Sequence, residues 1–460
     1  MTTEQDVAQI VRKQRSFFDS HGTQSYEFRL QSLKKLRDGL KRYEDALHSA
    51  LKRDLGKPEF EAYLTETGFN VHELTFTMKR LKRWMKPRRV RTPLLVQPAA
   101  SRIHYSPLGV TLIIGAYNYP LGTTLLPLIS AMAAGNTAII KPSELTPASS
   151  QMLRQMIEEL FRSDYLACVL GGVEETTALL RQKTDHILFT GSARVGSIVM
   201  KAAAEHLTPV TLELGGKSPC IVHEDAKLDV AVKRIASGKF LNAGQTCVAP
   251  DYVLVHRAVK EEFLEKLKQH VLKTYGQDAS ESPDFCRIVN DRHFRRIVSL
   301  IDRSRVVVGG QSDAATRYIA PTIMRDVTLD DPIMTEEVFG PVLPVMEYSN
   351  VRDIYRVVSA LPHHPLACYI FSESKSAQKE LVRTIQFGGG CINHCMQHLG
   401  NPNLPFGGVG QSGFGCYRGF SGFERLSHRK SVLKAASWID PSLVYPPYRG
   451  KLNALRKMLK

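Results

Sequence analysis

Apolar residues near the start of the chain recur at the spacing of helices. Between residues 28 and 53 they stand every three or four positions, with Lys, Arg, Glu and Asp between them, which is typical of an amphipathic helix. Another helix is expected from about Glu61 to Trp84. From Lys86 to Pro107 prolines and alternating residues replace this spacing, which predicts a hairpin or an extended arm.

The chain then alternates short apolar runs with helical segments. GVTLII, NTAIIKPS, YLACVLGG and HILFTGS are typical of strands, and the segments between them are typical of helices. This order predicts right-handed βαβ units and a parallel sheet. Ligands bind beyond the carboxyl ends of such strands, where AYNYP, KPSE and TGSARVG follow. A second α/β region is expected from about VTLELGGKSP to LPFGGVGQSGFG.

The composition describes an ordinary soluble protein. The chain has 460 residues, 43% of them hydrophobic and 23% charged, and is too long for one core, so two or three domains are expected. The first twenty residues contain no apolar signal region, and eight scattered cysteines favour reduced thiols in a cytoplasm. The uncharged segment from Ile103 to Ile140 is interrupted by Asn, Pro and Gly, so we expect it in a core and not in a membrane.

Part of the net charge of +16 is concentrated in two segments of the chain. Basic residues crowd the segment from Lys79 to Arg91, and the end of the chain, residues 446–460, combines basic residues with Leu452, Leu455 and Leu459 at helical spacing. No nucleic-acid-binding motif accompanies them, so no nucleic acid partner is expected. A basic amphipathic tail leaves peripheral contact with an anionic membrane open.

Two stretches carry candidate chemistry. Phe189–Gly196 follows an apolar strand and opens a helix, a junction that suits a phosphate, although its spacing departs from GxGxxG. Cys247 stands among small and polar residues in NAGQTCVAP, 34 residues after Glu213 in LELGGKSP. A presented thiol and a carboxylate next to glycines suggest covalent catalysis with a base for its second half.

These stretches and others resemble the aldehyde dehydrogenase superfamily. The matching motifs, in the order of that family, are GAYNYP, IIKPSE, FTGS, LELGGKSP, NAGQTC, EEVFGP and LPFGGVGQSGFG. The NYP and KPSE forms are similar to its class 3 branch. The resemblance implies an α/β fold with a Rossmann-like parallel-sheet cofactor domain, a second α/β catalytic domain and a small β oligomerisation arm. The implied limits are 1–85 and 105–211 for the cofactor domain, 212–419 for the catalytic domain, 86–104 and 420–445 for the oligomerisation elements, and 446–460 for the tail.

The resemblance also implies the roles of single residues. Cys247 matches the nucleophile, Asn118 matches the side-chain donor of the oxyanion hole, and Glu213 matches the base that activates water. The cofactor would be bound by Lys141, Glu144, Gly191, Ser192, Gly196, Glu337 and Phe339. Glu144 should repel a 2′-phosphate, which favours NAD and leaves NADP open.

The expected substrate is a medium- or long-chain aliphatic or aromatic aldehyde. Tyr117, Tyr119, His394 and Cys395 are expected on the substrate side. The CINHCMQH segment does not have the spacing of a zinc site, so no metal is predicted. The resemblance implies a homodimer in the cytoplasm, with peripheral contact at the inner membrane surface left open through the tail.

Two other functions remain open. An acylating enzyme would pass the thioester to coenzyme A, but Glu213 favours hydrolysis because thiolysis needs no base there. A membrane-docking protein without activity would have no need for Cys247, Glu213 and Asn118 together.

Overall fold

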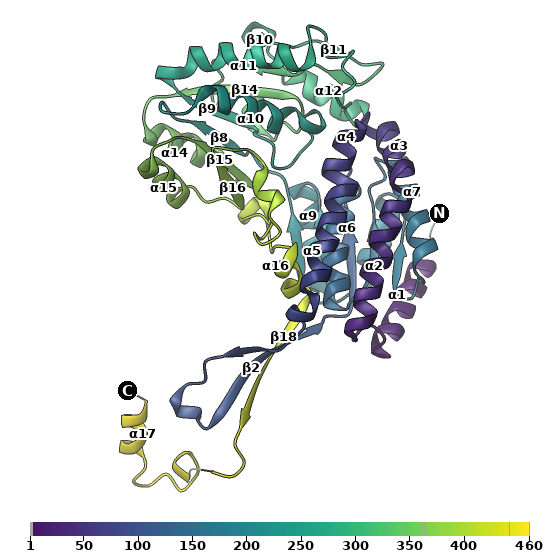
Figure 1. Cartoon of the computed structure of the whole chain (residues 1–460), viewed down its shortest axis with the longest axis vertical. Helices are drawn as coiled ribbons and strands as arrows, with labels where there is room; N and C mark the ends of the chain where they lie inside the picture. The colour runs from purple at the N-terminus through teal and green to yellow at the C-terminus, as the bar shows by residue number, and fades with distance from the viewer. Residues whose placement is uncertain (1–2, 362–363, 441, 460) are drawn as a thin grey trace.

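The N-terminal part of the protein is a set of helices that cover the first sheet. The computed structural model describes residues 3–361, 364–440 and 442–459. The helices are α1 (Glu4–Asp19), α2 (Tyr26–Arg42), α3 (Glu44–Leu55), α4 (Glu59–Ala62) and α5 (Gly68–Trp84). Figure 1 shows α2 and α5 as long helices side by side on one side of the body.

Both helical segments expected from the sequence are interrupted in the structure. The segment 28–53 is divided at Tyr43, which ends α2 and precedes α3, and two acidic residues in the first turn of α3 favour a new helix start there. Between α4 and α5 lies a π-helical turn, Tyr63–Thr67. Apolar spacing indicates that a segment is helical but does not fix where a helix ends or is interrupted, so the pattern did not reveal these positions.

The first sheet has six strands in the order β17-β7-β6-β3-β4-β5. Its parallel strands are β3 (Val110–Ile114), β4 (Thr137–Lys141), β5 (Leu166–Cys168), β6 (His186–Thr190) and β7 (Val210–Glu213), and β17 (Gly413–Phe414) runs antiparallel to β7. The connecting helices are α6 (Gly122–Ala134), α7 (Pro147–Leu160), α8 (Val173–Leu180) and α9 (Ala193–Glu205). The strand order reverses between β3 and β6, and a crevice at such a reversal is where ligands bind.

Strand β7 differs from the expectation from the sequence, which places it in the second region. All four of its residues are buried, and it pairs with β6 in the first sheet. A continuous apolar run is equally compatible with either sheet, so the run alone could not assign it. The domain limits themselves stay predictions.

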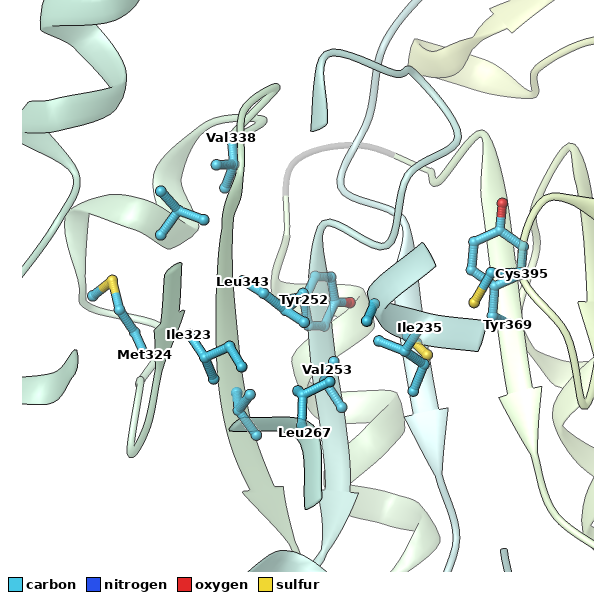
Figure 2. Close-up of a cluster of buried hydrophobic side chains, with 14 of the residues drawn as sticks. Ile235, Tyr252, Val253, Leu267, Ile323, Met324, Val338, Leu343, Tyr369 and Cys395 are labelled. Atoms are coloured by element: carbon cyan, nitrogen blue, oxygen red, sulfur yellow. The ribbon is translucent and has the colours of Figure 1, made fainter. Parts of the chain in front are cut away.

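The second sheet has seven strands in the order β10-β13-β14-β9-β8-β15-β16. They are β8 (Pro219–Val222), β9 (Tyr252–His256), β10 (Val306–Val308), β13 (Thr322–Met324), β14 (Val342–Tyr348), β15 (Ala367–Phe371) and β16 (Gly389–Ile392). The helices of this part are α10 (Leu228–Phe240), α11 (Lys260–Tyr275), α12 (Asp291–Ser299), α13 (Pro332–Thr335), α14 (Val351–Ala360) and α15 (Lys375–Thr384), and a small hairpin joins β11 (Ser312–Asp313) to β12 (Tyr318–Ile319). Figure 2 shows Tyr252, Leu343 and Ile235 packed together in its core.

A three-stranded antiparallel sheet forms an arm that extends from the body (Figure 1). It consists of β1 (Arg88–Val90), β2 (Ala99–Pro107) and β18 (Ser427–Ala435) in the order β1-β2-β18. Beyond it lies the short helix α17 (Leu452–Met458), while α16 (Gly419–Arg425) joins the arm to the body. No helix in the described residues is both long and apolar enough to cross a bilayer.

A buried ion pair ties α5 to the chain that returns from the second sheet. Glu73 and Arg418 are 0% and 3% exposed at their side chains, and their closest nitrogen and oxygen atoms are 3.1 Å apart. The other carboxylate oxygen of Glu73 accepts from the backbone N–H of Gly419 at 2.8 Å, and Arg418 donates to the carbonyl of Leu399. Glu73 therefore fixes the guanidinium of Arg418, and this guanidinium in turn holds the segment that follows β16.

The substitution Glu73→Ala should destabilise the protein strongly, because it leaves a buried guanidinium without its partner, which typically costs about 3–5 kcal/mol. The measurement is the apparent melting temperature, which should fall by several degrees. Glu158→Ala is the matched control, since it removes an exposed pair with Arg154 and should cost at most about 0.5 kcal/mol. Equal melting temperatures for the two variants would contradict the importance of the buried pair.

Candidate active site

The loop after β3 lies at the reversal of the first sheet. Asn118 is 3% exposed, and its backbone carbonyl accepts a hydrogen bond from the side-chain amide of Asn242 at 2.9 Å. None of the hydrogen bonds among the described residues uses the side-chain amide of Asn118 itself. Hydrogen bonds therefore fix the backbone at Asn118, and its side-chain amide remains available to donate a hydrogen bond to another group.

Cys247 follows a tight left-handed turn that only particular residues can adopt. Asn242, Ala243 and Gly244 have φ values of 54°, 49° and 72°. A Cβ on Gly244 would lie 2.2 Å from the carbonyl oxygen of Gly340, so glycine is required there. The buried side chain of Gln245 then bonds the Asn242 and Arg287 carbonyls and the Val289 N–H, all at 3.0 to 3.1 Å. This network fixes the direction in which the thiol is presented.

Glu213 ends β7 and has an unusual environment for a carboxyl group. It is 2% exposed, and neither of its carboxyl oxygens has a hydrogen-bond partner within the described part of the chain. Burial raises its pKa well above the ordinary value for glutamate. A carboxylate with a raised pKa is a stronger base than an ordinary one, so Glu213 in its ionised form is suited to take a proton from a neighbour.

The thiol of Cys247 is close enough to two carboxyl groups to be affected by their charges. Burial raises the pKa of Cys247 to about 12, and the negative charges of Glu337 and Glu213 contribute to this shift. The pKa of Glu337 is raised to about 8 by burial and by Asp251, against a hydrogen bond from the N–H of Gly216. The structure thus brings Cys247, Glu213 and Glu337 into one electrostatic cluster, in which burial raises the pKa of all three groups.

The glycines of LELGG allow this cluster to form. A Cβ on Gly215 would lie 1.9 Å from the carboxylate oxygen Oε2 of Glu337, so only glycine permits the approach. Glu213 leaves the carboxyl edge of the first sheet, and β8 begins six residues later in the second. Cys247 and Glu337 precede β9 and β14, at the amino edge of the second sheet. The site lies where these two edges meet.

The predicted cofactor residues of the first sheet stand at its carboxyl edge. Lys141 ends β4, is 3% exposed and pairs with Glu144 at 2.8 Å. Gly191 follows β6 and donates its N–H to the carbonyl of Glu213 at 3.0 Å. Ser192, which is exposed, caps the N-terminus of α9.

These residues fit a dinucleotide. The exposed N-terminus of a 13-residue helix favours a phosphate, and a Cβ on Gly196 would lie 2.8 Å from Leu214, so this glycine lets α9 pack close to the sheet. Lys141 and Glu144 offer charged and hydrogen-bonding groups at the next strand but one.

Aromatic rings line the approach from the side of Glu337. The ring centroid of Tyr117 is 5.9 Å from that of Phe339 and 5.4 Å from that of His293. Phe339 itself has a φ of 44°, a conformation that bulky residues adopt rarely and that is retained only when the surroundings enforce it. Tyr119 points to the Cys247 loop, since its hydroxyl lies 2.6 Å from that of Thr246.

The remaining predicted residues lie after β16. His394 is half-buried and accepts a hydrogen bond from the N–H of Cys395 at 2.9 Å. Cys395 is 4% exposed and belongs to the core of the second sheet, close to Gly238, and Figure 2 shows it beside Tyr369. Cys391 contacts His398 at 3.5 Å. In the described part of the chain no group of three or more His, Cys, Asp or Glu side chains could hold a metal ion.

Several residues of the site were not predicted from the sequence. Asn242 and Gln245 belong to the NAGQTC motif, so the motif was a signal for them. Lys57 and Glu66 contact the Asn118 loop. Lys57 lies in the short connection between α3 and α4, Glu66 lies in the π-helical turn, and no sequence pattern marks either residue.

Comparison with known proteins agrees with this geometry. Residues 1–432 match the model of the aldehyde dehydrogenase family. The chain is 45% identical to 4,4'-diaponeurosporen-aldehyde dehydrogenase from Staphylococcus aureus over 99% of both chains. It is 44% identical to the dimeric NADP-preferring aldehyde dehydrogenase of Rattus norvegicus, over 97% of this chain and 99% of that protein.

A solved structure is similar over its whole length. The substrate-bound state of Staphylococcus aureus AldH superposes with a TM-score of 0.96 at 44% identity and covers 99% of both chains. The predicted fold and family are therefore confirmed. The chain belongs to the aldehyde dehydrogenase family, close to its class 3 members, and is an NAD(P)-dependent enzyme that oxidises aldehydes to acids.

Proposed function

We propose that the oxidation proceeds through a covalent intermediate on Cys247, with Asn118 as oxyanion donor and Glu213 as base. The observation that carries these roles is the carboxyl group of Glu213, which is buried without a partner and close enough to raise the pKa of the Cys247 thiol. A structural carboxyl group would have hydrogen-bond partners. One that has none and lies beside a thiol is placed for proton transfer.

The first half of the reaction forms a thiohemiacetal. Ionised Glu213 takes the thiol proton as the sulfur of Cys247 adds to the aldehyde carbon, and negative charge develops on the aldehyde oxygen. Glu213 releases this proton to solvent before the second half of the reaction. The side-chain amide of Asn118 and the backbone N–H of Cys247 stabilise that oxygen, and one such donor is typically worth about 3 kcal/mol in the transition state. The oxidised nicotinamide supplies a hydride acceptor when it is bound.

The second half hydrolyses the thioester that remains on Cys247. Glu213 takes a proton from water, the hydroxyl oxygen adds to the thioester carbon, and the sulfur leaves with the proton returned to it. Glu213 also weighs against transfer to coenzyme A, since a thiol nucleophile needs no such base. The presence of the complete cluster weighs against a protein that only docks to a membrane.

For the cofactor we propose NAD with NADP accepted as well. Lys141 and Glu144 would bind the adenosine ribose, Gly191, Ser192 and Gly196 the pyrophosphate side, and Glu337 with Phe339 the nicotinamide ribose. Glu144 opposes a 2′-phosphate, but it is already paired with Lys141, whose ammonium would attract that group. The rat relative, named NADP-preferring, supports acceptance of both.

The substrate that we propose is a medium- or long-chain aliphatic or aromatic aldehyde. Tyr117 and Tyr119 flank Asn118, and we propose them with His394 as the pocket lining, whereas Cys395 would support that lining from the core. The name of the staphylococcal relative points to a long apolar aldehyde for that protein, which supports the same class here.

A homodimer is the proposed assembly. The arm exposes large apolar side chains, including Leu94 at 90%, Leu433 at 49% and Trp438 at 79%. Such a surface is typical of an interface, and the rat relative is named dimeric. Contact of the tail 446–460 with an anionic membrane and a cytoplasmic location stay predictions.

The variant Cys247→Ala should fold and bind cofactor but lose NADH and NADPH formation, because no other nucleophile is available in the cluster. The measurement is the rate of absorbance increase at saturating aldehyde. Cys168→Ala is the matched control, since it removes a buried thiol from β5 and should retain turnover. Substantial residual turnover in Cys247→Ala would rule out the covalent route.

The variant Glu213→Gln should separate the two halves of the reaction. We expect a first burst of NADH, followed by a steady-state rate reduced by about 10²–10⁴-fold, the usual contribution of a general base. Because burial raises the pKa of Glu213, its ionised fraction increases as the pH rises, so thioester hydrolysis in the unmodified enzyme should accelerate with pH through neutrality. In the Glu213→Gln variant the rate of thioester hydrolysis should not rise with pH in this way.

The products formed when coenzyme A is added to the unmodified enzyme decide between water and coenzyme A as the acceptor of the acyl group. If added coenzyme A yields an acyl-coenzyme A product at a rate that exceeds acid formation, Glu213 is not the base of the main reaction.

The aldehyde class should show in a series of straight-chain aldehydes. Each additional methylene buried in an apolar lining contributes about 0.8 kcal/mol, so kcat/KM should rise roughly two- to fourfold per methylene from short to medium chains. The measurement follows NADH and NADPH separately across the series. A maximum at acetaldehyde would contradict an apolar pocket.

A further inference from the structure

Lys57 is a fully buried lysine that the reaction scheme does not use. It lies between α3 and α4, its side chain is 0% exposed, and its ammonium donates to Glu66 Oε1 at 2.8 Å. Glu66, in the π-helical turn, is equally buried. Buried ion pairs are seldom retained for stability alone, because desolvation of both charges offsets most of their attraction. The other contacts of the pair therefore indicate its role.

Each member of the pair holds one end of the oxyanion loop. The ammonium of Lys57 donates to the backbone carbonyl of Asn118 at 3.2 Å. Glu66 Oε2 accepts from the N–H groups of Leu121 and Gly122 at 3.1 and 2.8 Å, at the start of α6. Burial raises the pKa of Glu66, whereas Lys57 and these hydrogen bonds lower it. The loop between Asn118 and Gly122 is thus fixed at both ends by one ion pair.

The same ammonium connects the loop to the nucleophile. It lies 4.4 Å from the ring centroid of Tyr119, whose hydroxyl contacts Thr246, the residue before Cys247. Asn242, from the Cys247 turn, donates to the same carbonyl of Asn118 that Lys57 uses. The position of the Asn118 side chain relative to the thiol depends on these contacts.

We propose that Lys57, anchored by Glu66, is a positioning residue that sets the Asn118 amide against the developing oxyanion. This inference rests on the role proposed for Asn118. Lys57 does not touch the substrate. It acts mainly through the backbone carbonyl of Asn118, so its loss should displace the oxyanion donor. The hydrogen bonds of Gln245, which do not involve Lys57, should still hold the loop of Cys247.

Two reactions of Cys247 distinguish this role from a general structural one. Acylation by p-nitrophenyl acetate generates an oxyanion at the ester carbonyl and needs no cofactor. Alkylation by iodoacetamide displaces iodide at a saturated carbon, so no oxyanion forms at the reacting centre. A residue that positions the oxyanion donor should affect the first reaction and spare the second.

The variants are Lys57→Met, the double variant Lys57→Met/Glu66→Gln, Asn118→Ala, and Lys260→Met as control. The double variant removes both buried charges, and the amide oxygen of the new side chain can still accept from Leu121 and Gly122, which protects folding. Lys260 forms an ion pair with Asp326 and Glu347 in the second domain and makes none of the contacts described for the site.

We expect the double variant to acylate about tenfold more slowly, because a displaced donor loses part of the 10²–10³-fold effect of removing one. The kcat for aldehyde should fall by a similar factor while KM changes little, and alkylation should remain at the rate of the unmodified enzyme. Lys260→Met should match the unmodified enzyme in every assay. Adding Lys57→Met to Asn118→Ala should cause no further loss, because both act through one group.

Each other outcome overturns a defined statement. Unchanged acylation in Asn118→Ala refutes the oxyanion role proposed for Asn118. Slow acylation in Asn118→Ala with normal acylation in the Lys57 variants refutes the positioning role alone. Equal losses of acylation and alkylation in the double variant refute it too, because they show a general disturbance of the Cys247 loop.

Discussion

The burial of Glu213 is the constraint on which the proposed chemistry depends, because its carboxyl group is 2% exposed and has no hydrogen-bond partner among the described residues. β7 places it at the carboxyl edge of the first sheet, and the glycines that follow let the chain cross directly to the amino edge of the second. Cys247 and Glu337 come from that second edge. Both sheets are therefore needed to bring the proposed base and the proposed nucleophile to one place.

Ion pairs that are buried elsewhere serve to hold this junction. Lys57 with Glu66 fixes the loop of Asn118. Lys217 pairs with Asp251 and also donates to the carbonyls of Ile333 and Glu336 at 2.9 Å, next to Glu337. Paired charges therefore hold the backbone around the site, whereas none of the ion pairs among the described residues involves Glu213 or Glu337. A low local dielectric constant strengthens the attraction within the buried ion pairs and makes it costly to ionise a buried carboxyl group that has no partner.

The sequence identified candidate reactive residues but not the buried contacts that hold the backbone around them. The motifs around Cys247, Glu213 and Asn118 are local, so their order along the chain identified the family and the expected fold. The pair of Glu73 and Arg418 joins residues 345 positions apart, and no local spacing reports such a contact. The run at residues 210–213, near which a second region was expected to begin, forms β7 and pairs with β6 in the first sheet, because an apolar run has the same appearance in either sheet. The π-helical turn that carries Glu66 was not expected, because apolar spacing does not fix where a helix is interrupted.

The same surroundings set the pKa values on which the two halves of the proposed reaction would depend. Burial raises the pKa of the Cys247 thiol, and the charges of Glu337 and Glu213 raise it further. Burial also raises the pKa of Glu213. A carboxylate with a raised pKa is a stronger base once it ionises. In the role proposed for it, Glu213 would therefore be suited to take a proton from the thiol in the first half and from water in the second.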